Sequence, residues 1–437
     1  MATERRDPFL SGFSRKKGVP PLGRDQVYAK YQSSNATSVG MTLIRSMRFA
    51  IISNSFPPDG LGGAERTAWV QAEGLAKEGH EVKVWAVGAA VGGRGSGVGI
   101  RPSTTDPRQP MPIVRFPSRF SDFSHMTFVS RFFFHLLVDA FARKDVVTDV
   151  MTWKPDILLT HNLVGCGMGT ARAIQKRGVT WAHTLHDIQL TDTFGQETVA
   201  WSATRIARIH RTLCSAHRRI FFGSPDVVVS PTKWLMNWHL AHGFFKNAKT
   251  AVIPNPIEIG APRERHLNMP ATIVYVGRLT RDKGFDVFLD AIKRLPVSLV
   301  GRIVAIGRGG LMANAERLHD RRLGMRGAVS FEDAHRAIAN ADLLVAPSQI
   351  LENQQTVLLQ AMAEGTPAVA TDVGGTRETL AGTGCPVVPS GDAMALKQAI
   401  TELLSSQEQW QDTSRVMRSH AGRHEREKYL VSLLRIL

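Results

Sequence analysis

Two positively charged side chains follow a strand-like run in the last third of the chain. Arg278 and Lys283 lie in GRLTRDKG, directly after the apolar run ATIVYV at 271–276. A helix is expected to begin there, and its first N–H groups and the positive end of its dipole attract a phosphate. Arg278 and Lys283 add fixed charge at the same place. The pattern predicts an anion-binding site.

A carboxylate and an amide follow another strand-like run. Glu352 and Asn353 come shortly after DLLVAPS at 342–348 and just before a second expected helix. Both motifs therefore lie at the carboxyl ends of parallel strands, the edge where open α/β sheets bind ligands. An isolated glutamate here would serve only as a cap that complements the helix dipole. Beside Arg278 and Lys283, we expect Glu352 and Asn353 to contact the same ligand.

The first half of the chain contributes a glycine-rich turn. Gly62 and Gly63 stand in FPPDGLGGAERT, which follows the strand-like run at 48–53 and enters a helix at about Ala64. Glycines leave the backbone N–H groups open to close approach by a phosphate or an acceptor. A tight turn without any ligand would use the same residues, so this motif gains weight only from its pairing with the charged motifs.

A histidine ends another strand-like run of the first half. His186 and Asp187 follow VTWAHTL at 179–185. At the carboxyl end of a strand the imidazole is expected to face the cleft and bond a ligand hydroxyl, with Asp187 orienting its ring. His183 lies within the strand and is not favoured. A structural histidine satisfied by the backbone is the alternative interpretation.

Strand-like and helix-like segments alternate along the chain, which is typical of βα units that form parallel sheets. In the first half the expected strands are 48–53, 81–87, 113–116, 156–161, 179–185, 226–230 and 250–253. In the second half they are 271–277, 302–307, 328–331, 342–347, 367–371 and 386–389. The sequence predicts an α/β protein with two doubly wound parallel sheets in series.

Together these motifs resemble the nucleotide-sugar glycosyltransferases of the GT-B fold, in particular the retaining family 4, of group 1 type. In that family a strand ending in Gly-Arg, a Lys-Gly a few residues on and a Glu-x7-Glu motif bind the donor and its leaving diphosphate. Arg278, Lys283 and Glu352 hold these places, and Gln360 stands where the family has its second Glu, usually assigned to the donor ribose. Gln can also exchange hydrogen bonds with hydroxyls. The segment 331–342, beside the nucleotide base, is shorter than in the family.

The resemblance implies two Rossmann-like domains facing a central cleft. It implies transfer of a sugar from a nucleotide-diphosphate donor to a hydroxyl with retention, in bacterial envelope or exopolysaccharide synthesis. The catalytic residues would be His186, Arg278, Lys283 and Glu352. The donor would be bound by Gly62, Gly63, Arg278, Lys283, Glu352, Asn353 and Gln360.

The same resemblance implies an enzyme without a metal or other cofactor beyond the nucleotide-sugar co-substrate. The leaving diphosphate needs positive charge, which Arg278, Lys283 and the helix N-terminus would supply. No two aspartates are two positions apart, as in the Asp-x-Asp metal site of some glycosyltransferases of the other common fold. The leaving phosphate would take the acceptor proton. No carboxylate of the first domain is a convincing nucleophile, which argues against a double displacement of the glycosidase type.

The expected domains follow from composition and from two prolines. Residues 1–46 hold eight Lys or Arg against three Asp or Glu and no apolar run, so we expect a disordered basic leader, with Met41 or Met47 as an alternative start. Pro254 and Pro256 deny the chain a helix and mark a boundary. We expect an acceptor-side domain at 47–254, a nucleotide-sugar domain at 255–415, and a helical segment at 416–437 that packs back on the first domain.

The composition, with 43% hydrophobic and 21% charged residues, is that of an ordinary globular protein. A net charge of +16 favours anionic partners, here a nucleotide-sugar donor and peripheral contact with an anionic membrane, while the acceptor would be a saccharide or lipid-linked. A solvated basic surface explains the charge equally well. No nucleic-acid motif accompanies the charge, so nucleic acid is not an expected partner.

No segment is typical of a membrane span, and the apolar stretch 128–141 is expected to form an amphipathic or core-packed helix. Cys166, Cys214 and Cys385 are odd in number and far apart, so buried thiols are expected in place of a disulfide or a Cys-based metal site. We expect a cytoplasmic protein, peripheral at the inner face of the membrane.

Three other classes of protein share some of these sequence features. A dinucleotide oxidoreductase would need G-x-G-x-x-G after its first strand, but the run GGRGSGVG at 92–99 follows the second and has the wrong spacing. A nucleotide-sugar epimerase or hydrolase of the same fold would share the nucleotide site. A catalytically weakened binding homologue is suggested by Gln360, whereas Arg278, Lys283 and Glu352 argue against it.

Overall fold

The computed structural model describes residues 46–57, 62–88, 101–102, 111–117, 139–192, 195–261 and 264–437. The expected leader up to residue 45, the glycine-rich run 92–99 and all but the last three residues of the apolar stretch 128–141 lie outside these ranges. Within the described residues, no helix combines the length and the apolar character that a bilayer span requires.

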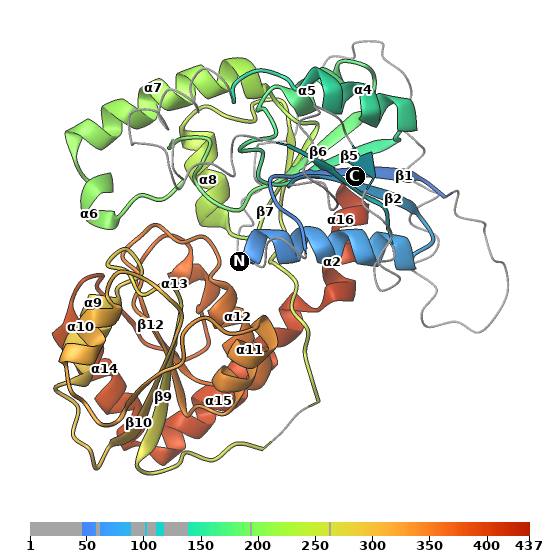
Figure 1. Ribbon diagram of the computed structural model, residues 1–437. Helices are drawn as coiled ribbons and strands as arrows, with labels where there is room; N and C mark the ends of the chain where they lie inside the picture. Colours follow the sequence, from blue (N-terminus) through green and yellow to red (C-terminus); the bar gives the residue numbers. More distant parts are fainter. Residues whose placement is uncertain are drawn as a thin grey trace, which may run out of the picture. The chain divides into compact units, whose positions relative to one another are not determined.

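The first sheet has eight strands in the order β3-β4-β2-β1-β5-β6-β7-β8 (Figure 1). All neighbours are parallel except β3 and β4. The strands are β1 (Arg48–Ser53), β2 (Glu81–Val87), β3 (Arg101–Pro102), β4 (Ile113–Phe116), β5 (Ile157–Thr160), β6 (Thr180–Thr184), β7 (Val227–Ser230) and β8 (Lys249–Val252).

Helices cover both faces of this sheet, because its central strands carry apolar side chains in both directions. One face packs on α4 (Lys144–Trp153), α5 (Thr170–Gln175) and α8 (Lys233–Ala241). The other packs on α2 (Gly63–Lys77) and on α16 (Arg426–Ile436) from the end of the chain. Figure 1 shows α16 beside α2. Two further helices, α6 (Val199–Ser202) and α7 (Arg205–Phe222), precede β7.

The second sheet is wholly parallel, with six strands in the order β11-β10-β9-β12-β13-β14. The strands are β9 (Ala271–Val276), β10 (Val300–Ile306), β11 (Leu323–Met325), β12 (Leu343–Ala346), β13 (Ala368–Thr371) and β14 (Val387–Val388). The helices are α9 (Phe285–Ile292), α10 (Met312–Arg317), α11 (Phe331–Ala339), α12 (Thr356–Glu364), α13 (Thr376–Thr379), α14 (Ala393–Ser405) and α15 (Gln407–Ala421), followed by the 3₁₀ turn η3 (Gly422–His424). One face packs on α9, α10 and α14, and the other on α11, α12 and α15.

Two doubly wound sheets are therefore confirmed, and all but one of the predicted strands are present. The strand predicted at 328–331 is wrong. Ser330 instead caps α11: its Oγ accepts a hydrogen bond from the backbone N–H of Asp333, 3.0 Å away. Glu332 and Asp333 occupy the first turn, where negative charge is favourable. This capping pattern overrides the β-propensity of Val329 and Phe331.

The end of the chain returns to the first sheet. Met417 and Ala421 of α15 are buried in the core of the second sheet, whereas Tyr429 and Leu433 of α16 are buried in the core of the first. The boundary at residue 254 and the divisions at 415 and 416 stay predictions. The three cysteines are buried, as expected.

Candidate active site

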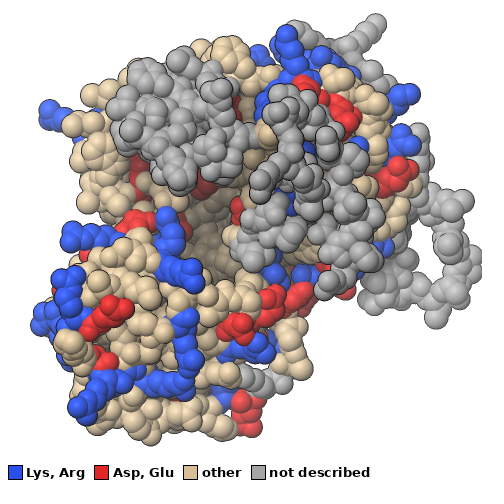
Figure 2. All heavy atoms as spheres, viewed as in Figure 1, with Lys and Arg blue, Asp and Glu red and all other residues tan. Residues whose placement is uncertain are grey.

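A cavity of about 770 Å³ opens at the carboxyl ends of strands from both sheets. Its walls include the turn before α2 and the residues after β6 from the first sheet, and the ends of β9, β10 and β12 from the second. Figure 2 shows a hollow in the surface with Lys and Arg side chains at its edge. The volume suits a small organic ligand.

The structure brings seven of the eight predicted site residues to this cavity: Gly62, Gly63, His186, Arg278, Lys283, Glu352 and Gln360. Asn353 is buried and is not part of the cavity wall. Its Oδ1 accepts from Thr232 Oγ1 at 2.6 Å, and its Nδ2 donates to the carbonyl of His186 at 3.2 Å. Asn353 thus links the two sheets, and its contact with the donor stays a prediction, as do the roles of the other seven residues.

Arg278 stands in the loop between β9 and α9, with its side chain 49% exposed. Its Nη2 donates to Asp282 Oδ2 at 2.6 Å and to Gln196 Oε1 at 3.0 Å. The loop is fixed from beneath by Tyr275, whose hydroxyl donates to the carbonyl of Arg278 at 2.6 Å. Burial raises the pKa of Tyr275 far above its ordinary value, so the phenol keeps its proton. The guanidinium is therefore held through Nη2 alone, while Tyr275 fixes the backbone of its loop.

Lys283 and Glu352 contact each other across the cavity wall. The Lys283 Nζ lies 2.5 Å from Glu352 Oε1, which also accepts from Ser348 Oγ at 2.9 Å. Both side chains are largely shielded from solvent, at 25% and 16% exposed. The pair places a positive and a negative charge side by side, so a diphosphate and a sugar hydroxyl could be bound by neighbouring groups.

Two glycines permit this arrangement. Gly284, directly after Lys283, has φ of +68°, and a Cβ there would lie 1.7 Å from the carbonyl oxygen of Pro347. Gly374 has φ of +56°, and its Cβ would lie 1.9 Å from the carbonyl oxygen of Glu352. Only glycine tolerates both the positive φ and the close approach. The loops that carry Lys283 and Glu352 are therefore packed tightly against their neighbours.

Two helices begin at the cavity without a capping side chain at the N-cap residue. The first residues of α2 and of α12 line the cavity, and neither Gly62 nor Gln355 at their N-caps offers a side-chain hydrogen bond. By contrast α7, α8 and α14 are capped by Thr204, Thr232 and Asp392. At α2 the Glu65 carboxylate already accepts from the backbone N–H groups of Gly62 and Glu65, whereas the N-terminus of α12 has no acidic residue in its first turn and leaves donors available for an anion.

His186 belongs to a buried hydrogen-bond chain that sequence reasoning missed. Its Nε2 lies 2.8 Å from Nδ1 of His161, whose Nε2 lies 3.0 Å from Gln71 Oε1. The amide nitrogen of Gln71 bonds the hydroxyl of Tyr429 in α16. Since the Gln71 oxygen can only accept, His161 carries its proton on Nε2 and accepts from Nε2 of His186. Burial lowers the pKa of His186 to about 4, so this imidazole is neutral at pH 7.

The predicted orienting role of Asp187 is wrong. Its Oδ1 accepts from the backbone N–H of Gln189 at 2.8 Å, and His161 takes the place expected for it beside His186. Asp187 itself lines the cavity. Burial raises the pKa of this carboxyl to about 6. A histidine on the neighbouring strand replaces the carboxylate because β5 and β6 end side by side.

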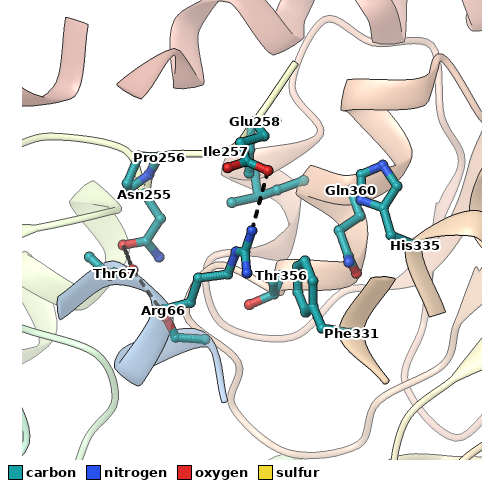
Figure 3. Close-up of a pocket in the computed structure, with 12 residues that line it drawn as sticks. Arg66, Thr67, Asn255, Pro256, Ile257, Glu258, Phe331, His335, Thr356 and Gln360 are labelled. Carbon is teal, nitrogen blue, oxygen red and sulfur yellow. Dashed lines mark hydrogen bonds and ion pairs between the residues drawn. The ribbon is translucent and has the colours of Figure 1, made fainter. Parts of the chain in front are cut away.

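A side pocket continues the cavity past Gln360 and Phe331 (Figure 3). The Arg66 guanidinium carbon lies 3.9 Å from the ring centroid of Phe331, and its Nη2 lies 3.6 Å from Glu258 Oε2. Gln360 is buried, and its Nε2 has no hydrogen-bond partner among the described residues. An unpaired buried donor is costly, so this amide is suited to a ligand oxygen.

Arg308 also lines the cavity and was missed by sequence reasoning. It follows β10 in the dipeptide Gly307-Arg308, as Arg278 follows β9 in Gly277-Arg278. Because β9 and β10 are adjacent and parallel, the two dipeptides meet at one sheet edge. The repeated Gly-Arg after neighbouring strands was the available signal.

One group in the described part of the chain has metal-ligating atoms within 4.8 Å of one another: Asp192, Glu197 and His210. The Glu197 carboxylate of this group already forms an ion pair with an arginine, since Arg211 Nη1 lies 2.5 Å from Glu197 Oε2. This group is not part of the cavity wall.

Buried histidines should make stability depend on pH. Burial lowers the pKa of His239, which lies away from the cavity, to about 4. Between pH 6.5 and 4 the unfolded chain binds a proton there that the folded chain does not, so the free energy of unfolding falls as pH falls. We expect His239→Gln to reduce the slope of the free energy of unfolding against pH, by an amount that corresponds to up to about one proton bound on unfolding. Chemical denaturation at several pH values measures this slope. The exposed His266→Gln serves as control, and an unchanged slope in His239→Gln would contradict the assignment.

Solved structures share this fold. Sucrose-phosphate synthase from Thermosynechococcus elongatus superposes with a TM-score of 0.66 at 17% identity, over 89% of this chain and 97% of that one. Anabaena HepE in complex with UDP gives 0.62 at 16% identity, over 89% and 98%. With its two parallel-sheet domains, the protein has the GT-B fold.

Family models match both sheets. The Glycosyl transferase 4-like domain matches residues 62–256, and Glycosyl transferases group 1 matches residues 270–406. The chain belongs to the group 1, family 4 type of glycosyltransferases.

Curated relatives match this chain over different shares of its length. An uncharacterized 42.6 kDa protein in the cps region of Klebsiella pneumoniae is 23% identical over 76% of this chain and 87% of its own length. Glycogen synthase of Mycobacterium tuberculosis is 24% identical over 82% and 86%. Phosphatidyl-myo-inositol mannosyltransferase of Mycobacterium leprae is 32% identical over 35% of this chain and 43% of its own length.

Proposed function

We propose that this glycosyltransferase moves a sugar from a nucleotide-diphosphate donor to a hydroxyl acceptor with retention of anomeric configuration. The observation that carries the proposal is the pairing of Arg278 and Lys283 at one cavity with Glu352 and the uncapped N-terminus of α12. Cations and free N–H groups suit a diphosphate, and a carboxylate suits sugar hydroxyls. Retention rests on the family resemblance.

Sugar transfer requires that the departing diphosphate be stabilised. Breaking the anomeric C–O bond moves an electron pair and its charge to the leaving phosphate oxygen, where Arg278 and Lys283 act as fixed cations. We propose that these groups take the place of a divalent metal. The leaving phosphate then accepts the proton of the acceptor hydroxyl as the new glycosidic bond forms. His186, neutral at pH 7, contacts a hydroxyl of the transferred sugar.

The acceptor is proposed to be a saccharide or a lipid-linked saccharide, used in bacterial envelope or exopolysaccharide synthesis. A Klebsiella relative in a cps region supports this setting. The proposed location is the cytoplasm, at the inner face of the membrane, with anionic lipid as a peripheral partner that the net charge of +16 favours.

Release of nucleoside diphosphate tests the proposal. The protein is incubated with a panel of nucleotide sugars, with and without a membrane extract as acceptor source, in buffer containing EDTA. Acceptor-dependent release supports transfer without a metal. Equal release without acceptor would instead favour a hydrolase, and interconversion of the donor sugar without release would favour an epimerase.

Gln360→Glu is expected to preserve or tighten donor binding. The amide nitrogen has no protein partner to lose among the described residues, and a carboxylate can accept from two ribose hydroxyls. Calorimetric titration with the nucleoside diphosphate measures the change. The exposed Gln409→Glu in α15 is a control with the same change in charge. A large loss of affinity in Gln360→Glu alone would show that the amide belongs to a different hydrogen-bond network.

A further inference from the structure

Helix α7 buries charged side chains and exposes large aliphatic ones, the opposite of what is usual for a helix on a globular protein. Its arginines Arg211 and Arg218 are buried, at 7% and 4% exposed. Its large aliphatic residues are exposed: Ile206 at 66%, Ile209 at 63%, Leu213 at 66% and Ile220 at 65%. A helix of a globular protein normally turns such residues inward. We name these four residues the α7 face.

The buried arginines fix the helix in this orientation. Arg211 Nη1 lies 2.5 Å from Glu197 Oε2, and its guanidinium carbon lies 5.3 Å from the ring centroid of Trp238. Arg218 Nη1 donates to the carbonyl of Asp192 at 2.8 Å. Rotation of α7 to bury the aliphatic residues would expose these contacts and leave Glu197 unpaired in the interior, which is costly. The outward direction of the α7 face is therefore built into the fold.

The α7 face is flanked by positive charge. Its members follow a spacing of three, four and seven residues, which aligns them along one side of a helix. Arg205, Arg208 and Arg219 are exposed beside them, and the sequence of α7 contains no Asp or Glu. Eighteen residues extend about 27 Å. Figure 1 shows α7 as a long helix on the first domain.

The charge around the α7 face favours an anionic bilayer over a second copy of the protein as its binding partner. A second copy of the helix would place arginine against arginine with no acidic partner, which disfavours self-association. An anionic bilayer offers both an apolar interior for the aliphatic side chains and phosphate groups for the arginines. We propose that α7 docks in the plane of a membrane that contains anionic lipid, with the α7 face in the acyl region.

This surface is connected to the cavity. Arg218 on the inner side of α7 bonds the carbonyl of Asp192, whose Oδ2 accepts from the N–H of Gln196 at 3.2 Å. Gln196 Oε1 accepts from Arg278 at 3.0 Å. As a means to reach a lipid-linked acceptor, the inference rests on the proposed function. Vesicle binding does not need transfer, however, so the two proposals fail in different measurements.

Co-sedimentation of the full chain with vesicles tests the docking. We expect binding to vesicles of phosphatidylcholine and phosphatidylglycerol, weaker binding to phosphatidylcholine alone, and a decrease with added salt. The double variant Ile209→Glu/Leu213→Glu should bind the anionic vesicles roughly tenfold or more weakly. Release of nucleoside diphosphate in solution should be unchanged in this variant.

A matched variant controls for the effect of the added negative charge on vesicle binding. Val297→Glu/Met394→Glu replaces two aliphatic residues of the second domain, 69% and 56% exposed, with the same change in net charge. This control should bind as the unaltered chain does. Equal binding by both double variants would overturn the proposal. So would absence of vesicle binding together with dimers that Ile209→Glu/Leu213→Glu disperses, since the α7 face would then pair with a second copy.

Discussion

The Arg278→Ala variant should remain folded and turn over roughly 100-fold or more slowly than the unaltered protein. Arg278 is half exposed, and its contacts with Asp282 and Gln196 use Nη2 alone. Nε and Nη1 therefore remain to donate to a phosphate oxygen that gains charge in the transition state. A hundredfold loss corresponds to about 2.7 kcal/mol, the size expected when one transition-state donor is removed.

Steady-state kinetics and calorimetric titration with the nucleoside diphosphate measure this loss. Arg281→Ala provides a control in the same loop, because Arg281 is exposed and does not line the cavity. Its turnover should match that of the unaltered protein. Turnover near normal in Arg278→Ala would remove Arg278 from the catalytic residues.

Lys283→Gln should have the larger effect, roughly 1000-fold on turnover. The change removes a cation and also leaves the Glu352 carboxylate, 16% exposed, without its partner 2.5 Å away. That carboxylate would then repel the incoming diphosphate. The loss should therefore appear in donor affinity as well as in turnover.

The double variant Lys283→Gln/Glu352→Gln separates the two causes. If repulsion contributes, donor affinity should recover in part relative to Lys283→Gln, whereas turnover should stay low. Lys293→Gln changes a surface lysine paired with Asp290 and should be without effect. If the loss of donor affinity in the double variant equals the sum of the losses in the two single variants, the ion pair does not couple these residues.

Much of the fold was predictable because parallel strands covered on both faces are continuous apolar runs. The run ATIVYV at 271–276 forms β9, one residue shorter than the strand predicted at 271–277. The error at 328–331 arose where a short run of mixed residues met a helix-capping pattern, with Ser330 and Asp333 three positions apart. Local capping decided the structure of that segment.

The site was predictable where chemistry follows strand ends. Arg278, Lys283 and Glu352 meet because β9 and β12 are neighbours whose carboxyl ends lie at one edge. The contacts of His186 could not be read from the sequence, because His161 and Gln71 come from other segments of the chain. Likewise, the sequence of α7 does not predict whether its arginines or its aliphatic residues face inward. That depends on Glu197 and Asp192, which contact the buried arginines.

Thermal denaturation with a panel of nucleotides tests the central claim most directly. The purified protein is heated without added metal in the presence of UDP, GDP, ADP, TDP, CDP and their common sugar conjugates. We expect one nucleoside diphosphate to raise the melting temperature selectively, and Arg278→Ala to abolish that rise. No shift with any of these ligands, or an equal shift in Arg278→Ala, would contradict a donor site built on Arg278.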